Sequence, residues 1–312
     1  MVLEVEGLTR RYGNVTALDK VNFTLSGRGI IGFVGANGAG KTTALRIMSG
    51  LEEPDAGDVK LDGLSIIDYP DKVRRKVGFM PDTLPDASDI TVKEYLNFFV
   101  NSFAEKDKRA SLFAETVEFT GVESFLKRKL GDLSKGMKQR VSLARLQIHN
   151  PELMLLDEPA AGLDPRARAE LHAMLKKMAD KGKMIFLSSH ILSELENMVS
   201  GVVIIDKGKV LQYGTMSEVA ASGIRETGVE RVILGTKNAV SEPVLELIRQ
   251  FKMVRSCRRS GLNYEIDIVS SEFGRFLSAL GEINFPLLWL RRAEKSVELE
   301  KLFLEVTGKG DK

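Results

Sequence analysis

The sequence lacks most features that would mark a disulfide-stabilised, membrane-spanning or nucleic-acid-binding protein. Cys257 is its single cysteine, and no Cys/His spacing typical of a zinc site occurs, so we expect a reducing compartment. No apolar run approaches the ~18 residues that a membrane-spanning helix needs. The 45 Lys and Arg residues nearly balance the 43 Asp and Glu residues, which argues against a nucleic-acid partner. Any role at a membrane would therefore require a separate protein.

The pattern of apolar residues divides the chain into two parts. Residues 1–215 alternate short apolar strands, such as Gly29–Val34, with glycine-rich turns and amphipathic helices, which is the pattern of an α/β fold. Residues from about 85 to 150 are predicted to be mostly helical. Residues 216–312 follow the order strand, helix, strand, strand, helix, strand, with one more helix at Val297–Val306. This order predicts a small α+β domain of the ferredoxin-like, split βαβ type.

A glycine-rich loop lies between the predicted strand Gly29–Val34 and a predicted helix from about Lys41 to Ser49. The loop and the helix start read Gly35, Ala36, Asn37, Gly38, Ala39, Gly40, Lys41, Thr42 and Thr43. The first eight residues fit G-x-x-x-x-G-K-[ST], in which glycines let backbone N–H groups surround a phosphate at a helix N-terminus. We expect the Lys41 ammonium to reach the β- and γ-phosphates of a nucleotide, and the Thr42 hydroxyl to ligate Mg²⁺.

Two adjacent acids end another predicted apolar strand, Leu153–Leu156. A buried strand does not end in Asp157 and Glu158 unless these carboxylates face a cation or a substrate. We expect Asp157 to hold Mg²⁺ through water and Glu158 to polarise the attacking water. His190 follows the strand predicted at Met184–Ser188. Because parallel strands end at the ligand edge of a sheet, its imidazole is expected to contact the γ-phosphate or that water.

The segment Leu133–Arg140 reads Leu-Ser-Lys-Gly-Met-Lys-Gln-Arg and resembles the signature, usually LSGGQ, of the ATP-binding cassette (ABC) family. Asp157–Pro159 and Ala161–Asp164 are similar to the acid pair and the D-loop of that family, and His190 is at the position of its switch histidine. The resemblance covers about residues 2–215. It implies a phosphate-loop cassette with an antiparallel β subdomain and a helical subdomain that carries the signature. It also implies an ATP-hydrolysing subunit of an ABC transporter.

The resemblance adds roles for residues outside the glycine loop. Tyr12 is at the position of the aromatic residue that stacks on adenine, and such a stack contributes ~1–3 kcal/mol. Ser134 and Gly136 of one copy would contact the γ-phosphate that is held by the glycine loop of the other copy. ATP would thereby join two cassettes head to tail, and hydrolysis would let them separate.

Three positions depart from the family pattern. Lys135 and Met137 replace the first glycine and the glutamine of the usual signature. Asp82 replaces a glutamine that touches magnesium in the family, and we regard it as a third candidate metal ligand beside Thr42 and Asp157. A carboxylate there is shorter than glutamine and carries a charge.

Residues 216–312 resemble the small C-terminal domain of some ABC exporter ATPases, whose permease is a separate chain. The resemblance implies ATP and Mg²⁺ as ligands. Its partners would be permease subunits and either a second copy of this chain or a paralogous cassette, without nucleic acid. It also implies a peripheral position on the cytoplasmic face of the cell membrane. Three alternatives stay open, namely a non-transport ABC ATPase, a nucleotide switch with little turnover, and a phosphate-loop kinase, although the kinase offers no account of the signature.

Overall fold

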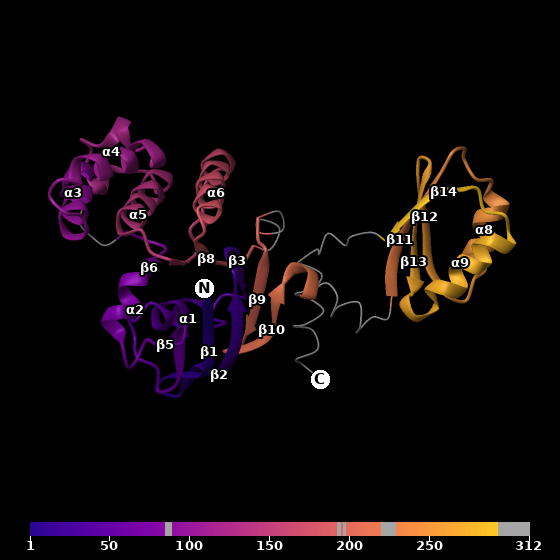
Figure 1. The fold of residues 1–312 in the computed structure, drawn as a ribbon, viewed down its shortest axis with the longest axis horizontal. Helices are drawn as coiled ribbons and strands as arrows, with labels where there is room; N and C mark the ends of the chain where they lie inside the picture. The colour runs from indigo at the N-terminus through magenta and orange to yellow at the C-terminus, as the bar shows by residue number, and fades with distance from the viewer. Residues whose placement is uncertain (85–88, 192–194, 196–197, 220–228, 293–312) are drawn as a thin grey trace. The chain divides into compact units, whose positions relative to one another are not determined.

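The computed structural model describes residues 1–84, 89–191, 195, 198–219 and 229–292. The chain divides after Met216 into two compact units (Figure 1). Among the described residues, the first unit holds two sheets and a group of helices, and the second holds one sheet with two helices.

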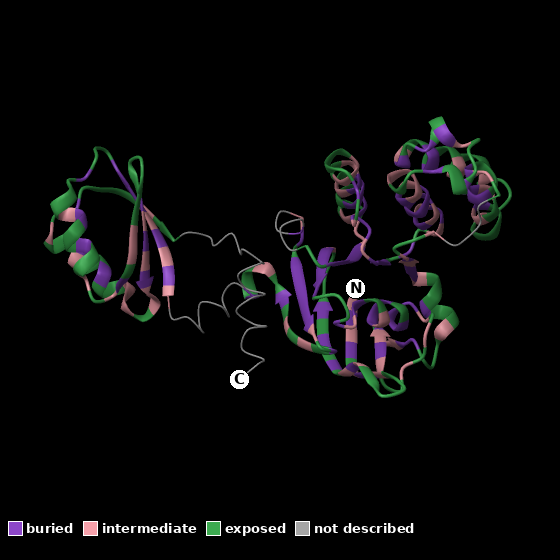
Figure 2. Cartoon of the chain, turned by 180° about the vertical axis from the view of Figure 1, so that it is seen from behind, coloured by how far each residue is buried: buried purple, intermediate pink, exposed green. Residues whose placement is uncertain are grey.

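The first unit is built on a six-stranded sheet in the order β10-β9-β3-β8-β7-β6. Five strands run parallel, and β10 pairs antiparallel with β9. The strands are β3 (Gly29–Val34), β6 (Val77–Met80), β7 (Leu153–Leu156), β8 (Met184–Ser189), β9 (Gly201–Asp206) and β10 (Lys209–Thr215). Strands β7 and β8 are buried along their whole length (Figure 2). This burial explains the apolar runs Leu153–Leu156 and Met184–Leu187, because parallel strands are covered on both faces.

A second sheet of the first unit is antiparallel and has the order β2-β1-β4-β5. Its strands are β1 (Val2–Tyr12), β2 (Val15–Ser26), β4 (Ala56–Leu61) and β5 (Leu64–Ser65). One face of β2 is buried, and its Phe23 ring stacks on Phe186 of β8 with centroids 5.9 Å apart. The two sheets therefore share one core, in which helix α1 (Lys41–Met48) also packs. The predicted antiparallel β subdomain is confirmed.

Three helices, α3 (Val92–Phe103), α4 (Arg109–Thr120) and α5 (Lys135–His149), form a separate core of their own. Helix α3 begins at a capping box, in which the Thr91 hydroxyl accepts from the Glu94 backbone N–H and the Glu94 carboxylate accepts from the Thr91 backbone N–H. The predicted helical subdomain is confirmed. Two further helices of the first unit are α2 (Pro70–Lys76) and α6 (Pro165–Asp180). No helix in the described part of the chain is long and apolar enough to cross a membrane.

The second unit contains an antiparallel sheet in the order β12-β13-β11-β14. Its elements are β11 (Val229–Thr236), α8 (Glu242–Gln250), β12 (Val254–Ser260), β13 (Asn263–Val269), α9 (Phe273–Glu282) and β14 (Leu287–Arg292). Both helices pack on one face of the sheet, so that alternate residues of β13 are buried. Numbered along this unit, the strand order is 4-1-3-2, which confirms the split βαβ arrangement. The helix predicted at Val297–Val306 lies outside the described residues.

Candidate nucleotide site

The glycine loop leaves the end of β3 and leads into α1, as its sequence predicts. Two glycines are required by their surroundings. A Cβ on Gly35 would lie 2.4 Å from the carbonyl oxygen of Ile205 in β9. Gly40 adopts a φ of 105°, and a Cβ there would lie 2.5 Å from the carbonyl oxygen of Ala17 in β2. The loop is therefore held against strands of both sheets before any ligand binds.

Lys41, at the first turn of α1, turns its side chain back over the loop. Its ammonium donates hydrogen bonds to the carbonyl oxygens of Gly35 at 2.7 Å and Ala36 at 3.1 Å, and it lies 3.5 Å from a carboxylate oxygen of Glu158. The side chain is only 6% exposed. A buried ammonium in a glycine loop is a strong donor for an anionic oxygen, which accepts a better hydrogen bond than a carbonyl does.

Asp157, which follows β7, is satisfied at both carboxylate oxygens although it is 4% exposed. One oxygen accepts from the Thr42 hydroxyl at 2.7 Å, and the other accepts from the Ser188 hydroxyl at 2.8 Å. The Ser188 oxygen in turn accepts from the backbone N–H of Glu158 at 2.8 Å. These bonds join the loop helix to the ends of β7 and β8, and they remove the cost of burying the charge.

Glu158 lies between Lys41 and His190. One carboxylate oxygen faces the Lys41 ammonium, and the other lies 2.9 Å from Nδ1 of His190. Its backbone adopts a φ of 45°, in a left-handed region that costs a residue with a Cβ about 1–2 kcal/mol. Such strain persists where the surrounding structure fixes the residue, as it often does at functional sites. The predicted cluster of Lys41, Thr42, Asp157, Glu158 and His190 is thus connected by direct contacts.

Asp82 lies apart from this cluster in the contacts of the described residues. Its carboxylate is exposed and accepts a long hydrogen bond of 3.4 Å from Thr83. Its backbone carbonyl accepts from the side-chain amide of Gln139 in α5 at 3.2 Å. A contact between Asp82 and the metal therefore stays a prediction.

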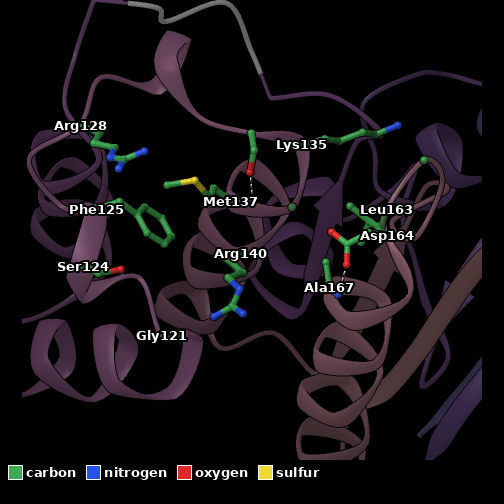
Figure 3. A pocket seen from close by; sticks show the side chains of 13 residues that line it. Gly121, Ser124, Phe125, Arg128, Lys135, Met137, Arg140, Leu163, Asp164 and Ala167 are labelled. Carbon is green, nitrogen blue, oxygen red and sulfur yellow. Dashed lines mark hydrogen bonds between the residues drawn. The ribbon is translucent and has the colours of Figure 1, made fainter.

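The signature residues line a different pocket, of about 660 Å³, between the start of α5 and the start of α6 (Figure 3). Ser134 is the N-cap of α5, and its hydroxyl accepts from the Met137 backbone N–H at 3.4 Å. Across the pocket, Asp164 caps α6 by accepting from the backbone N–H groups of Arg166 and Ala167. Gly136 also lines this pocket. The signature and the D-loop segment thus face one space, with two helix N-termini directed toward it.

Tyr12 ends β1 and is 45% exposed. Its hydroxyl donates to a carboxylate oxygen of Glu52, and the Arg10 guanidinium lies over its ring, 5.0 Å from the centroid. The contact with Glu52 was not predicted, because residues 40 positions apart give no local signal of contact. Ser188 was also missed as a site residue. The sequence position of Ser188, directly after an apolar strand, could have indicated its role. Strands β7 and β8 pair in parallel with Leu156 opposite Leu187, so that Ser188 lies beside Asp157.

Comparisons with known proteins agree with this geometry. The family model described as ABC transporter matches residues 18–161. Linearmycin resistance ATP-binding protein LnrL of Bacillus subtilis is 30% identical over 99% of both chains. Bacitracin transport ATP-binding protein BcrA of Bacillus licheniformis is 34% identical over 68% of this chain and 69% of BcrA. A solved structure of an ATP-binding subunit of an ABC transporter is 29% identical, with a TM-score of 0.65 over 73% of this chain and 94% of that chain.

The chain therefore belongs to the ABC transporter family. Within that family it is an ATP-binding subunit, an ATPase of the cassette type, as the signature at Leu133–Arg140 predicted. The alternative of a phosphate-loop kinase is set aside.

Proposed function

We propose that two copies of this cassette, or one copy and a paralogous cassette, bind MgATP between them and drive export through a separate membrane permease. The observation that carries this proposal is the continuous set of contacts from Thr42 through Asp157 and Ser188 to Glu158 and His190. It supports a site in which metal-binding and water-activating groups are oriented by the fold.

Mg²⁺ fits the oxygen donors that the loop and β7 bring together. The Thr42 hydroxyl and the Asp157 carboxylate lie 2.7 Å apart, and Mg²⁺ prefers such oxygen ligands together with phosphate oxygens and water. These two residues would hold the ion, with Asp82 as a third candidate. When bound, the ion would neutralise part of the charge on the β- and γ-phosphates.

Residues of the loop would bind the nucleotide, and two side chains would act on water. Backbone N–H groups of residues 35–43 and the Lys41 ammonium would hold the phosphates. Glu158 would accept a proton from the water whose oxygen bonds to the γ-phosphorus. The bond from the γ-phosphorus to the β–γ bridging oxygen would break, and ADP would leave with that oxygen and the electron pair. His190, 2.9 Å from Glu158, would orient this carboxylate and contact the γ-phosphate. Tyr12 would stack on the adenine.

The open signature pocket supports a site completed by a second cassette. Ser134 and Gly136 stand at the start of α5, beside the N-terminus of α6. Hydroxyl and backbone N–H donors at a helix start suit a phosphate oxygen. The γ-phosphate held by the partner's loop would therefore bind here, and ATP would favour the closed pair over the separated chains.

Export and a membrane location are favoured by the names of the relatives, which are a resistance protein and a bacitracin transport protein. The first of these matches along 99% of its length, so its match includes the predicted second domain, residues 216–312, as well as the cassette, residues 1–215. We therefore propose that the chain lies on the cytoplasmic face of the cell membrane, bound to permease subunits.

The test replaces Glu158 by glutamine, which keeps the side-chain size and removes the base. We expect Glu158→Gln to bind ATP, to lose at least about 100-fold in turnover, and to accumulate as an ATP-dependent dimer in size-exclusion chromatography. Glu152→Gln is the matched control, since Glu152 precedes the same strand β7 and its half-exposed side chain forms an ion pair with Lys76. Equal turnover in Glu158→Gln and wild type, or a variant that stays monomeric with ATP, would contradict the proposal.

A further inference from the structure

The side chains of Arg10, Tyr12 and Glu52 form a closed set of three contacts at the end of β1. The Arg10 Nε donates to a Glu52 carboxylate oxygen at 2.9 Å, and the Tyr12 hydroxyl donates to the same oxygen. The Arg10 guanidinium lies over the Tyr12 ring, 5.0 Å from its centroid. Each of the three side chains thus touches the other two, which fixes both the tilt and the position of the ring.

A fourth residue ties this set to the backbone. Asp55 accepts from Arg10 Nη1 at 3.1 Å and from the backbone N–H of Arg11 at 2.6 Å, and its own N–H donates to the Thr9 carbonyl. Glu52 and Asp55 follow α1, whose first residue is Lys41. The end of β1 is therefore attached to the segment that continues from the phosphate-binding helix.

The two charged side chains that make these contacts are partly buried. The side chains of Glu52 and Arg10 are 16% and 25% exposed, whereas the Tyr12 residue is 45% exposed. The two charged groups are thus partly withdrawn from water, while a large part of the ring stays accessible. A ring that is already fixed loses little conformational entropy when a flat base stacks on it.

We propose that Arg10 and Glu52 are positioning residues that hold Tyr12 as a preset platform for the adenine base. This proposal rests on the proposed function, in which the nucleotide binds at residues 35–43 with Tyr12 against the base. Arg10 covers one face of the ring, and the base stacks on the other. Recognition of the base is thereby separable from recognition of the phosphates, which belongs to the glycine loop.

The test measures the binding of two probes by titration calorimetry, MgATP and inorganic magnesium tripolyphosphate, which lacks a base. Arg10→Ala is expected to lower the affinity for MgATP about two- to fivefold, the range of a partly exposed cation–aromatic contact. Glu52→Gln is expected to lower this affinity about threefold, because a neutral amide oxygen accepts weaker hydrogen bonds from Arg10 and Tyr12 than a carboxylate does. Neither variant should change the affinity for tripolyphosphate. In turnover assays the KM for ATP should rise while kcat stays within error.

A double-mutant cycle shows whether Arg10 acts through Tyr12. Tyr12→Ala alone should lower the affinity for MgATP about tenfold. Adding Arg10→Ala to this variant should not lower the affinity further. Lys60→Ala is the matched control, since Lys60 forms an ion pair with Glu6 at 2.7 Å in the same sheet. That variant should bind both probes as wild type does.

Four results would overturn the proposal. They are equal weakening of both probes, tighter ATP binding by Arg10→Ala, additive effects of the Arg10 and Tyr12 substitutions, and unchanged ATP binding by Arg10→Ala. Failure of the wild-type protein to bind either probe would instead refute the proposed function itself, so the two failures are distinguishable.

Discussion

The glycine-loop half and the signature half of the cassette differ in how far the chain itself satisfies their polar groups. In the loop half, Lys41, Asp157 and Glu158 are all partnered within the chain, and the carboxylate of Asp157 is buried. In the signature half, Ser134 and Lys135 are exposed at a pocket of about 660 Å³. The Ser134 hydroxyl makes a hydrogen bond of 3.4 Å, which is long for this kind of contact.

This difference indicates that the two halves have different requirements. The loop half is organised by its own fold, whereas the signature half is a surface that we propose another copy completes. Glycines illustrate the contrast. A Cβ on Gly35 would overlap the Ile205 carbonyl at 2.4 Å, while a Cβ on Gly136 would make an ordinary contact of 3.4 Å with Ala167. We infer that Gly35 is required by the fold, whereas the fold leaves room for a side chain at Gly136.

The largest expected effect follows from placing a negative charge in the signature pocket. Gly136→Asp should fold normally but repel the partner's γ-phosphate, and turnover should fall about 100-fold or more, the scale of losing a preorganised donor. Binding of ATP to the monomer should stay unchanged, as measured by titration calorimetry. If Gly136→Asp hydrolysed ATP at the wild-type rate, the proposed role of the signature half would be wrong.

A methyl group at Gly35 should affect stability instead. Gly35→Ala forces the loop away from β9, and overpacking of this kind costs about 1–3 kcal/mol. For a unit of this size each kcal/mol lowers Tm by about 2–4 °C, which calorimetry detects. Gly136→Ala is the control and should have the same Tm as wild type. If the two alanine variants had the same Tm, the proposed difference between the loop half and the signature half would be wrong.

Ser188→Ala tests the connection inside the loop half. The substitution leaves one Asp157 oxygen and the Glu158 N–H without their shared partner, at a cost of about 1–3 kcal/mol. We expect kcat to fall about tenfold, because Glu158 is then less well oriented. Ser189→Ala is a neighbouring control, since the Ser189 hydroxyl contacts only Ile191 among the described residues. A kcat equally reduced in both variants would argue against a specific role of Ser188.

Much of the fold could be predicted because its signals are local. Strand β7 begins and ends at the predicted residues, and the order of elements after residue 216 predicted the split βαβ sheet. The glycine loop and the acid pair were found because their residues are adjacent in sequence.

The contacts that orient the site could not be predicted in the same way. Ser188 meets Asp157 across two parallel strands, 31 residues apart, and Arg10 meets Glu52 across 42 residues. Such contacts depend on register and on the packing of α1 between the sheets, and neither is visible in a short pattern. The sequence therefore indicates which groups act, while the structure indicates what holds them.

The smallest expected effect concerns His172 of α6, behind the loop half. Its Nε2 atom is buried without a hydrogen-bond partner among the described residues, next to a small cavity that Glu158–Ala161 and Ser188 also line. Burial, with a smaller contribution from the charge of Arg168, lowers the pKa of His172. In the unfolded chain the imidazole is protonated near pH 6.5. The unfolded state therefore binds more protons below that pH, and stability falls as the pH falls through about 6.5.

His172→Leu should remove part of this loss, because leucine cannot be protonated. Between pH 7.5 and 5.5 the free energy of unfolding of wild type should fall by at most about 1 kcal/mol more than that of His172→Leu. The partial exposure of the ring keeps this difference small. Urea unfolding at the two pH values measures it. His149 is the control, since burial also lowers its pKa, and His149→Leu should remove a separate part. If only the His149 variant reduced the pH dependence, His172 would make no measurable contribution to the acid sensitivity of the fold.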